Sequence, residues 1–323
     1  MPELPDVTVY VERLTAVAGG STLLGIRLRS PFLLRSVEPP LSSAKDRRVR
    51  SIRRLGKRIV IELEGDLYLV LHLMIAGRLH WRPLGTPIAA RQNLAAFDFS
   101  SGSLVLTEQS TKRRASLYLA AGSQALREHD RGGLEPLSCS YQEFKQRLTS
   151  ENHTLKRALT APHLFSGIGN AYSDEILHAA ELSPVTLSSR LTAAQVRKLH
   201  RATVATLKHW TEILRAEAGL EFPKKVTAFR SGMAVHGRFR EPCPRCATLI
   251  QRIRYAENEV NYCPRCQTGG RMLADRSLSR LLGDDWPRTV DAWEEEHPGL
   301  IAPQSIPTLP GDAAAASAGD GED

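Results

Sequence analysis

The chain is organised around its beginning, Met1-Pro2-Glu3-Leu4-Pro5-Asp6, which leads directly into a periodic segment. Apolar side chains then recur at the i, i+3, i+4 and i+7 spacing of a helix with one buried face, and Asp6 is placed to act as its N-cap. The apolar positions are Val7, Tyr10, Val11, Leu14, Val17 and Ala18. We expect this helix to dock on the fold and to fix the position of Pro2 and Glu3.

Pro2 could act as a nucleophile. A Met before a small residue is usually trimmed, which would leave Pro2 with a free secondary amine. An α-amino group titrates near neutral pH, so part of it is unprotonated and can attack an electrophilic carbon. The alternative is that Pro2 is only a favourable residue before a helix.

Composition sets limits on the class of protein. The 323 residues fit two domains with tails, and 42% hydrophobic residues is ordinary for a globular protein. The net charge is +8; residues 300–323 hold four acidic side chains and no Lys or Arg, so the rest of the chain has a net charge of +12. This excess suits a polyanionic partner. The sequence shows no membrane-length apolar run and no signal-peptide layout, so we expect a soluble cytoplasmic protein without a membrane partner.

The first domain has the pattern of a sheet. Between Leu24 and Leu106 the apolar period changes to two, as in Ile59, Ile61 and Leu63, and turn signals separate the runs. This pattern predicts an antiparallel β-sandwich or flattened barrel with one helix attached. Gly and Pro punctuate residues 131–137, which we interpret as an interdomain linker.

The second half has helical spacing, and a glycine turn interrupts it. The expected helices cover residues 141–148, 154–159, 171–180 and 193–216. Gly167 and Gly169 flank Ile168 in the turn before the third helix, where exposed backbone N–H groups would suit a phosphate. Such a turn can also serve packing alone.

The C-terminal part contains two Cys-Pro-Arg-Cys knuckles separated by sixteen residues, with ligand candidates Cys243, Cys246, Cys263 and Cys266. Four thiolates complete a tetrahedral zinc site, so the spacing predicts one structural Zn²⁺ in a ribbon, in preference to redox pairs. The hairpin between the knuckles carries Arg252, Arg254 and Asn258. Only Cys139 is left single, which argues against a disulfide framework.

These patterns predict an α+β architecture. The expected parts are an N-terminal β-sandwich domain with a leading helix over residues 1–130, a helical domain over 138–236 and a zinc ribbon over 237–282. After Trp286 the chain is rich in Pro, Ala, Gly and Asp, which predicts a disordered tail over residues 286–323.

Four features, in this order, resemble the formamidopyrimidine-DNA glycosylase and endonuclease VIII family of DNA repair enzymes. They are the N-terminal Met-Pro-Glu-Leu-Pro, Gly56-Lys57 in a strand context, the segment from Gly167 to Leu177, and the zinc ribbon. The likeness runs from Met1 to about Leu282. It implies a helix-two-turn-helix motif in the helical domain and damaged double-stranded DNA in the cleft between the domains. We expect a monomer, because one cleft takes one duplex, in a cytoplasm of bacterial type and associated with the nucleoid.

The resemblance assigns chemistry to the N-terminus. Pro2 would attack C1′ of a damaged nucleotide flipped out of the duplex, and Glu3 would donate the proton that opens the deoxyribose. The resulting iminium link between Pro2 and C1′ would permit β-elimination and then δ-elimination. The implied activity is therefore that of a bifunctional DNA glycosylase and abasic-site lyase. Lys57 and Asn170 would each hold a phosphate; without the resemblance they would be a solvated strand charge and a turn residue.

The residues that search for damage follow the family less closely. Asp6, at a catalytic position, stands where the family usually has Glu. The candidates for the wedge that fills the gap in the duplex are Met74 and Ile75, although both fit a core strand equally well. The family's Asp-Pro-Arg-Arg-Phe stretch is absent. In its place lie Lys112, Arg113 and Arg114, which can contact phosphates.

The zinc ribbon also differs from the family pattern. The family has an Arg five residues before its third Cys, and here that position is Asn258, which loses a bidentate, charge-assisted contact. Arg252 or Arg254 could substitute from the same hairpin.

Two rival functions therefore remain. One is a DNA-binding member that recognises abasic sites or unusual structures but has lost base excision; the missing Arg and the rebuilt wedge favour it, whereas Pro2, Glu3 and Lys57 favour the enzyme. The other is a helix-two-turn-helix RNA binder, which leaves the first residues without a role. The preferred base depends on a loop within residues 221–235 and does not follow from the sequence.

Overall fold

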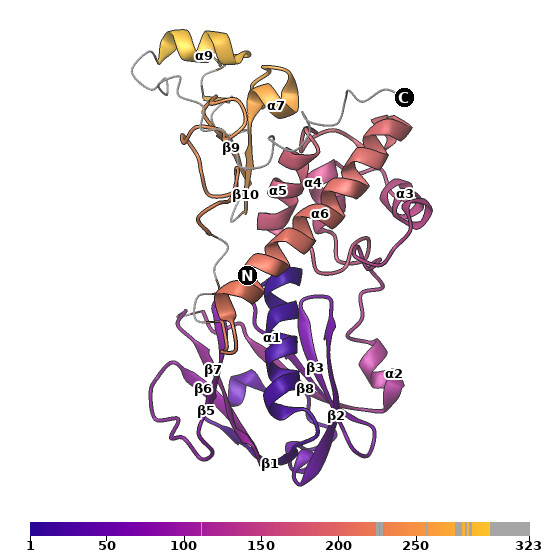
Figure 1. Cartoon of the computed structure of the whole chain (residues 1–323), viewed down its shortest axis with the longest axis vertical. Coiled ribbons are helices and arrows are strands. Elements are labelled where there is room, and N and C mark those ends of the chain that lie inside the picture. The colour runs from indigo at the N-terminus through magenta and orange to yellow at the C-terminus, as the bar shows by residue number, and fades with distance from the viewer. Residues whose placement is uncertain are drawn as a thin grey trace, which may run out of the picture.

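The computed structural model describes residues 1–110, 112–223, 226, 229–255, 258–274, 280–281, 283 and 286–297. A β-sandwich forms one end of the molecule, helices and a small hairpin form the other, and the N-terminus lies between them (Figure 1). Within these residues, no helix has both the length and the apolar character needed to cross a membrane.

The chain opens with α1 (Leu4–Ala18), which buries Val7, Tyr10 and Leu14 as predicted. The prediction of Asp6 as N-cap was wrong: Glu3 is the N-cap residue, and Asp6 lies three positions later. The carboxylate of Asp6 accepts a hydrogen bond from Glu3 N at 3.0 Å. Pro5 is compatible with the first turn of a helix, because that turn does not use its missing N–H, so the helix begins earlier than expected.

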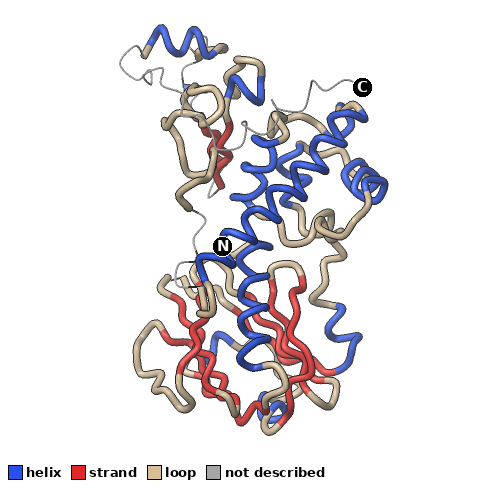
Figure 2. The backbone as a smooth tube through the Cα atoms, viewed as in Figure 1, coloured by secondary structure: helices blue, strands red, loops and turns tan. Residues whose placement is uncertain are grey.

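Eight antiparallel strands follow α1. They are β1 (Thr22–Leu28), β2 (Arg47–Leu55), β3 (Arg58–Leu63), β4 (Leu67–His72), β5 (Gly77–Arg82), β6 (Asn93–Phe99), β7 (Gly102–Glu108) and β8 (Ser116–Ala121), with short 3-10 helices η1 (Pro31–Leu33) and η2 (Leu41–Ala44). The strand order is β5-β7-β6-β1-β2-β3-β4-β8, and β1 and β2 pair only at their ends. The two halves of this order face each other as layers (Figure 2), which confirms the predicted sandwich.

The core of the sandwich explains why β3 is apolar on both faces. Ile59, Ile61 and Leu63 point into the main core between the layers. Val60 points the other way, into a smaller cluster with Leu126 of α2 (Gly122–Arg127). The strict alternation of a half-exposed strand is therefore lost in β3.

The helical half contains α3 (Tyr141–Thr149), α4 (Leu155–Thr160), α5 (Asn170–Ala179), η3 (Ser188–Arg190) and α6 (Ala193–Ala218). Their starts have local causes: Ser140 and Thr192 cap α3 and α6 by accepting hydrogen bonds from backbone N–H groups. Leu4, the first residue of α1, is part of the hydrophobic core of this half. The N-terminus is thus fixed at the junction of both halves.

The C-terminal module consists of β9 (Gln251–Tyr255), β10 (Asn258–Tyr262) and α7 (Pro264–Thr268). The predicted disorder after Trp286 was wrong for α9 (Val290–Glu296), which Thr289 caps and Arg265 joins to the module through Asp291. Residues 298–323 lie outside the described part. The helical domain with its four-Cys module completes the predicted α+β fold.

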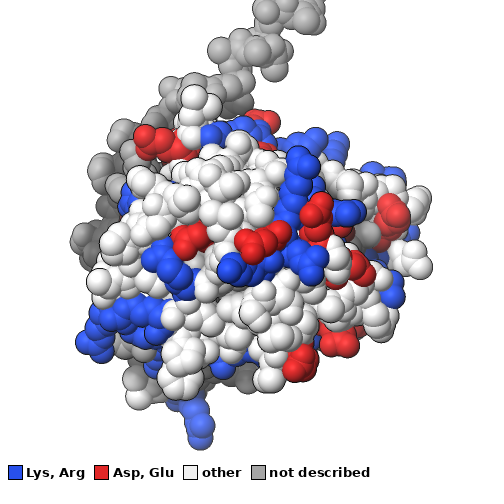
Figure 3. Space-filling model, turned by 90° about the horizontal axis from the view of Figure 1, so that it is seen from below, with Lys and Arg blue, Asp and Glu red and all other residues white. Residues whose placement is uncertain are grey.

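The basic side chains do not form one continuous patch at the sandwich end of the molecule. Figure 3 shows this face with Lys and Arg in several separate groups and acidic side chains between them. Pairs such as Arg27 and Asp98, 2.6 Å apart, neutralise part of the charge of the sandwich. On this face (Figure 3), positive and negative side chains therefore alternate.

Candidate active site

The first residues of the chain lie buried at the junction of the two halves. Pro2 and Glu3 are both buried, and Glu3 is 3% exposed. Leu4 N donates a hydrogen bond to Gly167 O at 2.9 Å, which ties the N-terminus to the glycine turn before α5. Segments that are more than 160 residues apart in sequence therefore meet here.

The Glu3 carboxylate lies on the N-terminus of α5. It accepts hydrogen bonds from Gly169 N at 2.6 Å, Ala171 N at 2.9 Å and Tyr172 N at 3.3 Å. A helix N-terminus favours a negative charge, because its first N–H groups have no partner in the helix. The N–H groups that the sequence offered to a phosphate are thus bonded to a side chain of the protein itself.

Lys57 approaches the same point from the sandwich. Lys57 and the preceding Gly56 form the two-residue turn between β2 and β3, and the turn uses the positive φ of 62° at Gly56. A Cβ atom added to Gly169 would lie 2.4 Å from Glu3 Cδ and 2.6 Å from Lys57 Nζ. Burial lowers the pKa of Lys57, the Glu3 carboxylate opposes this shift, and Lys156 adds to it. The turn needs glycine at position 169 because a carboxylate and an ammonium group pack against its backbone.

We therefore expect Gly169→Ala to lower the free energy of unfolding by about 1–3 kcal/mol, the cost of overpacking a close contact. Denaturant titration measures the change. Gly25→Ala is the matched control, since a Cβ there meets no atom within 4 Å and should change stability by about 0.5 kcal/mol or less. Equal effects of the two substitutions would contradict the close packing of Glu3 and Lys57 on Gly169.

The amino terminus itself is in a low-polarity environment. Burial lowers the pKa of the Met1 amino group, the carboxylates of Glu3 and Asp6 oppose this shift, and Arg78 and Lys57 add to it. An amine at this place is therefore more readily deprotonated than one in water.

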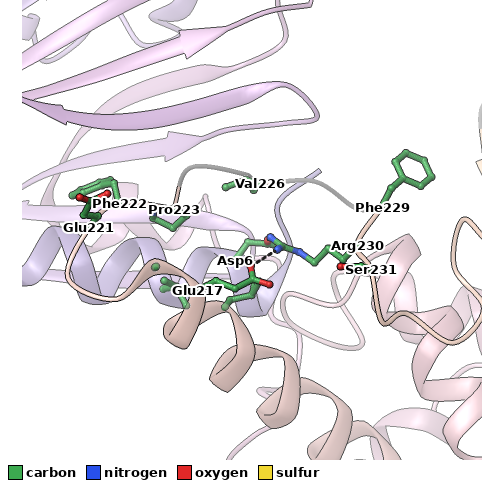
Figure 4. A pocket seen from close by; sticks show the side chains of 12 residues that line it. Asp6, Glu217, Glu221, Phe222, Pro223, Val226, Phe229, Arg230 and Ser231 are labelled. Carbon is green, nitrogen blue, oxygen red and sulfur yellow. Dashed lines mark hydrogen bonds and ion pairs between the residues drawn. The ribbon is translucent and has the colours of Figure 1, made fainter.

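Asp6 lines a separate cavity of about 500 Å³ between α1, the end of α6 and the following loop. Asp6 Oδ1 is 3.0 Å from Arg230 Nη2, and Arg230 also pairs with Glu217 at 3.1 Å (Figure 4). Burial raises the pKa of Asp6, whereas the hydrogen bond from Glu3 N and the Arg230 charge lower it. Arg230 was not predicted as a site residue, because no local pattern links it to a residue 224 positions away.

A larger cavity of about 800 Å³ opens on the other side of the N-terminus. Met1, Lys57, Lys156, Arg157 and Asn170 line it, so the cavity is basic. Lys156 Nζ donates to Asn170 O at 2.6 Å and to Asp174 Oδ1 at 2.5 Å. Lys156 was also missed at the sequence level, because it lies among the buried positions of a short helix and leaves the helical period unbroken.

Asn170 lies at the edge of this cavity. Its side-chain Nδ2 donates to Glu259 O of β10 at 2.8 Å, so the amide holds the zinc-module hairpin against α5. Further along α5, Glu175 accepts hydrogen bonds from Ala234 N, Val235 N and His236 N at 2.7–2.9 Å. Helix α5 thus connects Glu3 to the C-terminal module.

The wedge candidates lie in the turn between β4 and β5. Met74 has a φ of 51° and is half-buried, whereas Ile75 is 57% exposed. Of the two, Ile75 is therefore the side chain that solvent or a partner can reach. Single exposed apolar side chains are common on protein surfaces, so this exposure makes Ile75 accessible without assigning it a role.

The basic loop between β7 and β8 is organised by Glu108, which is 2% exposed. Its carboxylate accepts hydrogen bonds from Arg114 N at 3.1 Å and Ala115 N at 3.2 Å. Arg113 donates to Arg91 O at 3.0 Å, and Lys112 is exposed.

On the hairpin of the zinc module, Arg252 lies 4.1 Å from the ring centre of Phe239 and 3.4 Å from the Glu259 carboxylate. Arg254 is 62% exposed and lies 3.7 Å from the same carboxylate. Arg252 and Arg254 are thus on one face of β9. The side chain of Asn258 lies outside the described residues.

The four predicted zinc ligands come together. The Sγ atoms of Cys243, Cys246, Cys263 and Cys266 all lie within 4.8 Å of one another. Individual Sγ–Sγ distances of 3.4–3.9 Å agree with the separation of about 3.8 Å that tetrahedral zinc with Zn–S bonds of about 2.3 Å requires. His178 Nε2 of α5 is 3.3 Å from Cys243 Sγ, a contact typical of a group that supports a metal ligand. The site therefore fits one structural Zn²⁺.

Three family models match successive parts of the chain. Residues 1–117 match the formamidopyrimidine-DNA glycosylase N-terminal domain, residues 133–218 its H2TH domain, and residues 240–269 a zinc finger found in FPG and IleRS. These matches cover the sandwich, the helical half and the cysteine knuckles in the order seen in the structure.

Similar proteins point the same way. A formamidopyrimidine-DNA glycosylase of Solibacter usitatus is 31% identical over 83% of this chain and 99% of its own length, and one of Heliobacterium modesticaldum is 32% identical over 83% and 100%. An uncharacterized formamidopyrimidine-DNA glycosylase-like protein of Mycobacterium tuberculosis is 38% identical over 46% of this chain and 93% of its own length.

Solved structures share the fold. A complex of Lactococcus lactis Fpg with DNA containing an abasic site covers 82% of this chain and 99% of its own, with 23% identity and a TM-score of 0.72. A MutM complex with DNA containing carbocyclic 8-oxo-G covers 83% and 100%, with 24% identity and a TM-score of 0.73. Taken with the matches over almost the full length of its relatives, these likenesses establish that the chain belongs to the formamidopyrimidine-DNA glycosylase family of DNA repair enzymes.

Proposed function

We propose that this protein removes damaged bases from double-stranded DNA and cuts the strand at the resulting abasic site. The observation that carries the proposal is the meeting of Pro2, Glu3 and Lys57 at the junction of the two halves. The names of its relatives, and the damaged or abasic DNA bound in the similar structures, support the substrate class.

The proposed first step requires that Met1 is removed. The lone pair of the Pro2 nitrogen then forms a bond to C1′ of the flipped nucleotide, the electrons of the glycosidic bond leave with the base, and the proton that the Pro2 nitrogen loses passes to the departing base. Glu3 protonates the ring oxygen as the deoxyribose opens to an iminium. Its three hydrogen bonds to α5 would fix the carboxyl group for this transfer.

Strand cleavage follows from the iminium. Loss of a C2′ proton expels the phosphate on the 3′ side in β-elimination, and a second elimination expels the phosphate on the 5′ side. We assign Lys57 to hold one of these phosphates, and Asn170 to keep the zinc hairpin beside the strand. Asp6, together with Arg230, would bound the pocket for the extruded base.

The remaining contacts are assigned to the duplex. Ile75, with Met74 behind it, would enter the gap left by the base. Lys112, Arg113 and Arg114 would contact the phosphate backbone from one side, and Arg252, Arg254 and Asn258 from the other. We propose that the protein acts as a monomer in a bacterial cytoplasm. Its proposed domains span residues 1–130, 138–236 and 237–282.

Trapping with borohydride tests the reaction. Protein whose mature N-terminus is confirmed by mass spectrometry is incubated with a duplex containing one abasic site, and borohydride reduces the iminium to a stable covalent link. We expect a protein–DNA adduct for the processed protein and none for protein with an uncleaved N-terminal extension. Lys57→Arg is the second control, because Lys57 carries another amine close to Glu3 and acts on the N-terminal amino group.

The outcomes separate the candidates. An adduct that survives the N-terminal extension but disappears in Lys57→Arg would assign the nucleophile to Lys57 and overturn the role of Pro2. Binding of the abasic duplex without any adduct would support the rival function, a damage-binding protein that has lost catalysis.

A further inference from the structure

A third cavity, of about 300 Å³, lies on the linker side of the N-terminus. Its lining includes Lys57, Arg58, His72, His129, Arg131 and Thr160. Met1, Lys57 and Thr160 also line the larger basic cavity. The two cavities therefore adjoin at the point where the strand would be cut.

One cation of this cavity, Arg58, is only partly hydrogen-bonded. Arg58 Nη1 donates to His129 O at 2.9 Å, but its buried Nε has no hydrogen-bond partner within the described part of the chain. Burial lowers the pKa of Arg58, and the nearby charge of Arg131 adds to this shift. Arg58 and Arg131 thus repel each other, Asp130 offsets part of this repulsion, and a bound anion that accepts from the unpartnered Arg58 Nε would stabilise the group.

Among the described residues that line the cavity, Asp130 is the acidic one, and it also supports the linker. Asp130 Oδ1 accepts a hydrogen bond from Gly132 N at 2.8 Å, which forms the turn of the linker. Among the lining side chains, Lys57, Arg58 and Arg131 give three positive charges and Asp130 gives one negative charge, an excess of two positive charges.

The two imidazoles add hydrogen-bonding capacity without charge. Burial lowers the pKa of His72 to about 4, and the charges of Arg58 and Lys57 add to the shift. Burial and Arg58 also lower the pKa of His129, whose ring packs 4.6 Å from that of Tyr118. A neutral imidazole still donates one N–H to an anion.

We propose that this cavity binds a phosphate monoester, the chain end that is left when the strand is cut. The inference rests on the proposed function, which supplies such an end next to Lys57. A phosphodiester within a strand carries one negative charge, whereas a monoester carries nearly two at pH 7, because its second pKa is about 6. The excess of two positive charges in the cavity therefore matches a monoester.

Direct binding tests this site without catalysis. The probes are short single-stranded oligonucleotides of one sequence, ending in a 3′-phosphate, a 5′-phosphate or only hydroxyl groups. At one fixed salt concentration, we expect one phosphorylated probe to bind about tenfold tighter than the hydroxyl probe, the gain typical of one charge-assisted hydrogen bond. The comparison of the two phosphorylated probes shows which end the cavity takes.

Variants locate the effect. Arg131→Gln should reduce the preference for the phosphorylated end to less than about twofold, and Arg58→Gln should do the same if thermal unfolding shows it folded. Arg201→Gln removes the same charge from an exposed position of α6, outside the cavity, and should keep the preference.

Two outcomes overturn the site: equal binding of all probes, or a preference that survives Arg131→Gln and a folded Arg58→Gln. Because no reaction is needed, failure here leaves the borohydride result untouched. Conversely, the absence of an adduct does not determine the result of this binding assay, so the two proposals can fail separately.

Discussion

Removal of zinc is expected to release the β9–β10 hairpin and α7 from the helical half while the β-sandwich stays folded. In its described residues the module has two small apolar clusters, around Ile250 and around Ile253, which is too little burial to hold it alone. Structural zinc contributes about 10–16 kcal/mol of apparent binding free energy in zinc-finger peptides, far more than such clusters provide. The sandwich has its own continuous core and needs no metal.

Hydrogen exchange with a zinc chelator measures this release. Amides of Gln251–Tyr255 and Asn258–Tyr262 should lose protection, whereas those of Arg58–Leu63 and Leu67–His72 should keep it. Cys263→Ser should reproduce the effect of the chelator. Cys139→Ser is the matched control, because Cys139 lies outside the cluster. Unchanged protection in the hairpin after metal removal would contradict a structural role for zinc.

The features that the sequence predicted well are those with a local cause. Four helices of the second half begin and end within a few residues of the expected positions, because capping residues and apolar spacing act within one or two turns. The cysteine knuckles were recognisable because their ligand spacing is set by one metal. The tail was misjudged although a local signal existed: Thr289 caps α9.

The features that escaped prediction join distant residues. Glu3 on the N-terminus of α5 and Asp6 beside Arg230 depend on how α1 meets the second half of the chain, and Lys156 beside Asp174 depends on how α4 packs on α5. Periodicity reports which face of an element is buried, but not which polar group it will meet there. For the same reason the glycine turn was recognised, while the carboxylate that occupies its N–H groups was not.

Glu3→Ala is expected to lower the free energy of unfolding by about 3 kcal/mol and to abolish strand cleavage. The substitution removes the acceptor of three backbone N–H groups at a site that is 3% exposed, and buried donors without a partner cost about 1–3 kcal/mol each before they relax toward water. Denaturant titration measures the loss. Glu12→Gln is the control on the same helix: its pair with Arg215 is exposed and should contribute about 1 kcal/mol or less.

Glu3→Gln separates the two roles of this side chain. Glutamine has the size of glutamate and keeps one acceptor oxygen, but its NH₂ group faces an N–H donor and it cannot donate the proton that opens the sugar. We therefore expect Glu3→Gln to be more stable than Glu3→Ala, to remain folded at the assay temperature, and still to lose strand cleavage. If Glu3→Gln cleaves normally, the carboxyl group has no chemical role. If Glu3→Ala unfolds at the wild-type midpoint, the contact with α5 does not join the two halves. Only the combination of a destabilised Glu3→Ala and a folded, inactive Glu3→Gln supports one carboxyl group that both positions the helical half and takes part in the reaction.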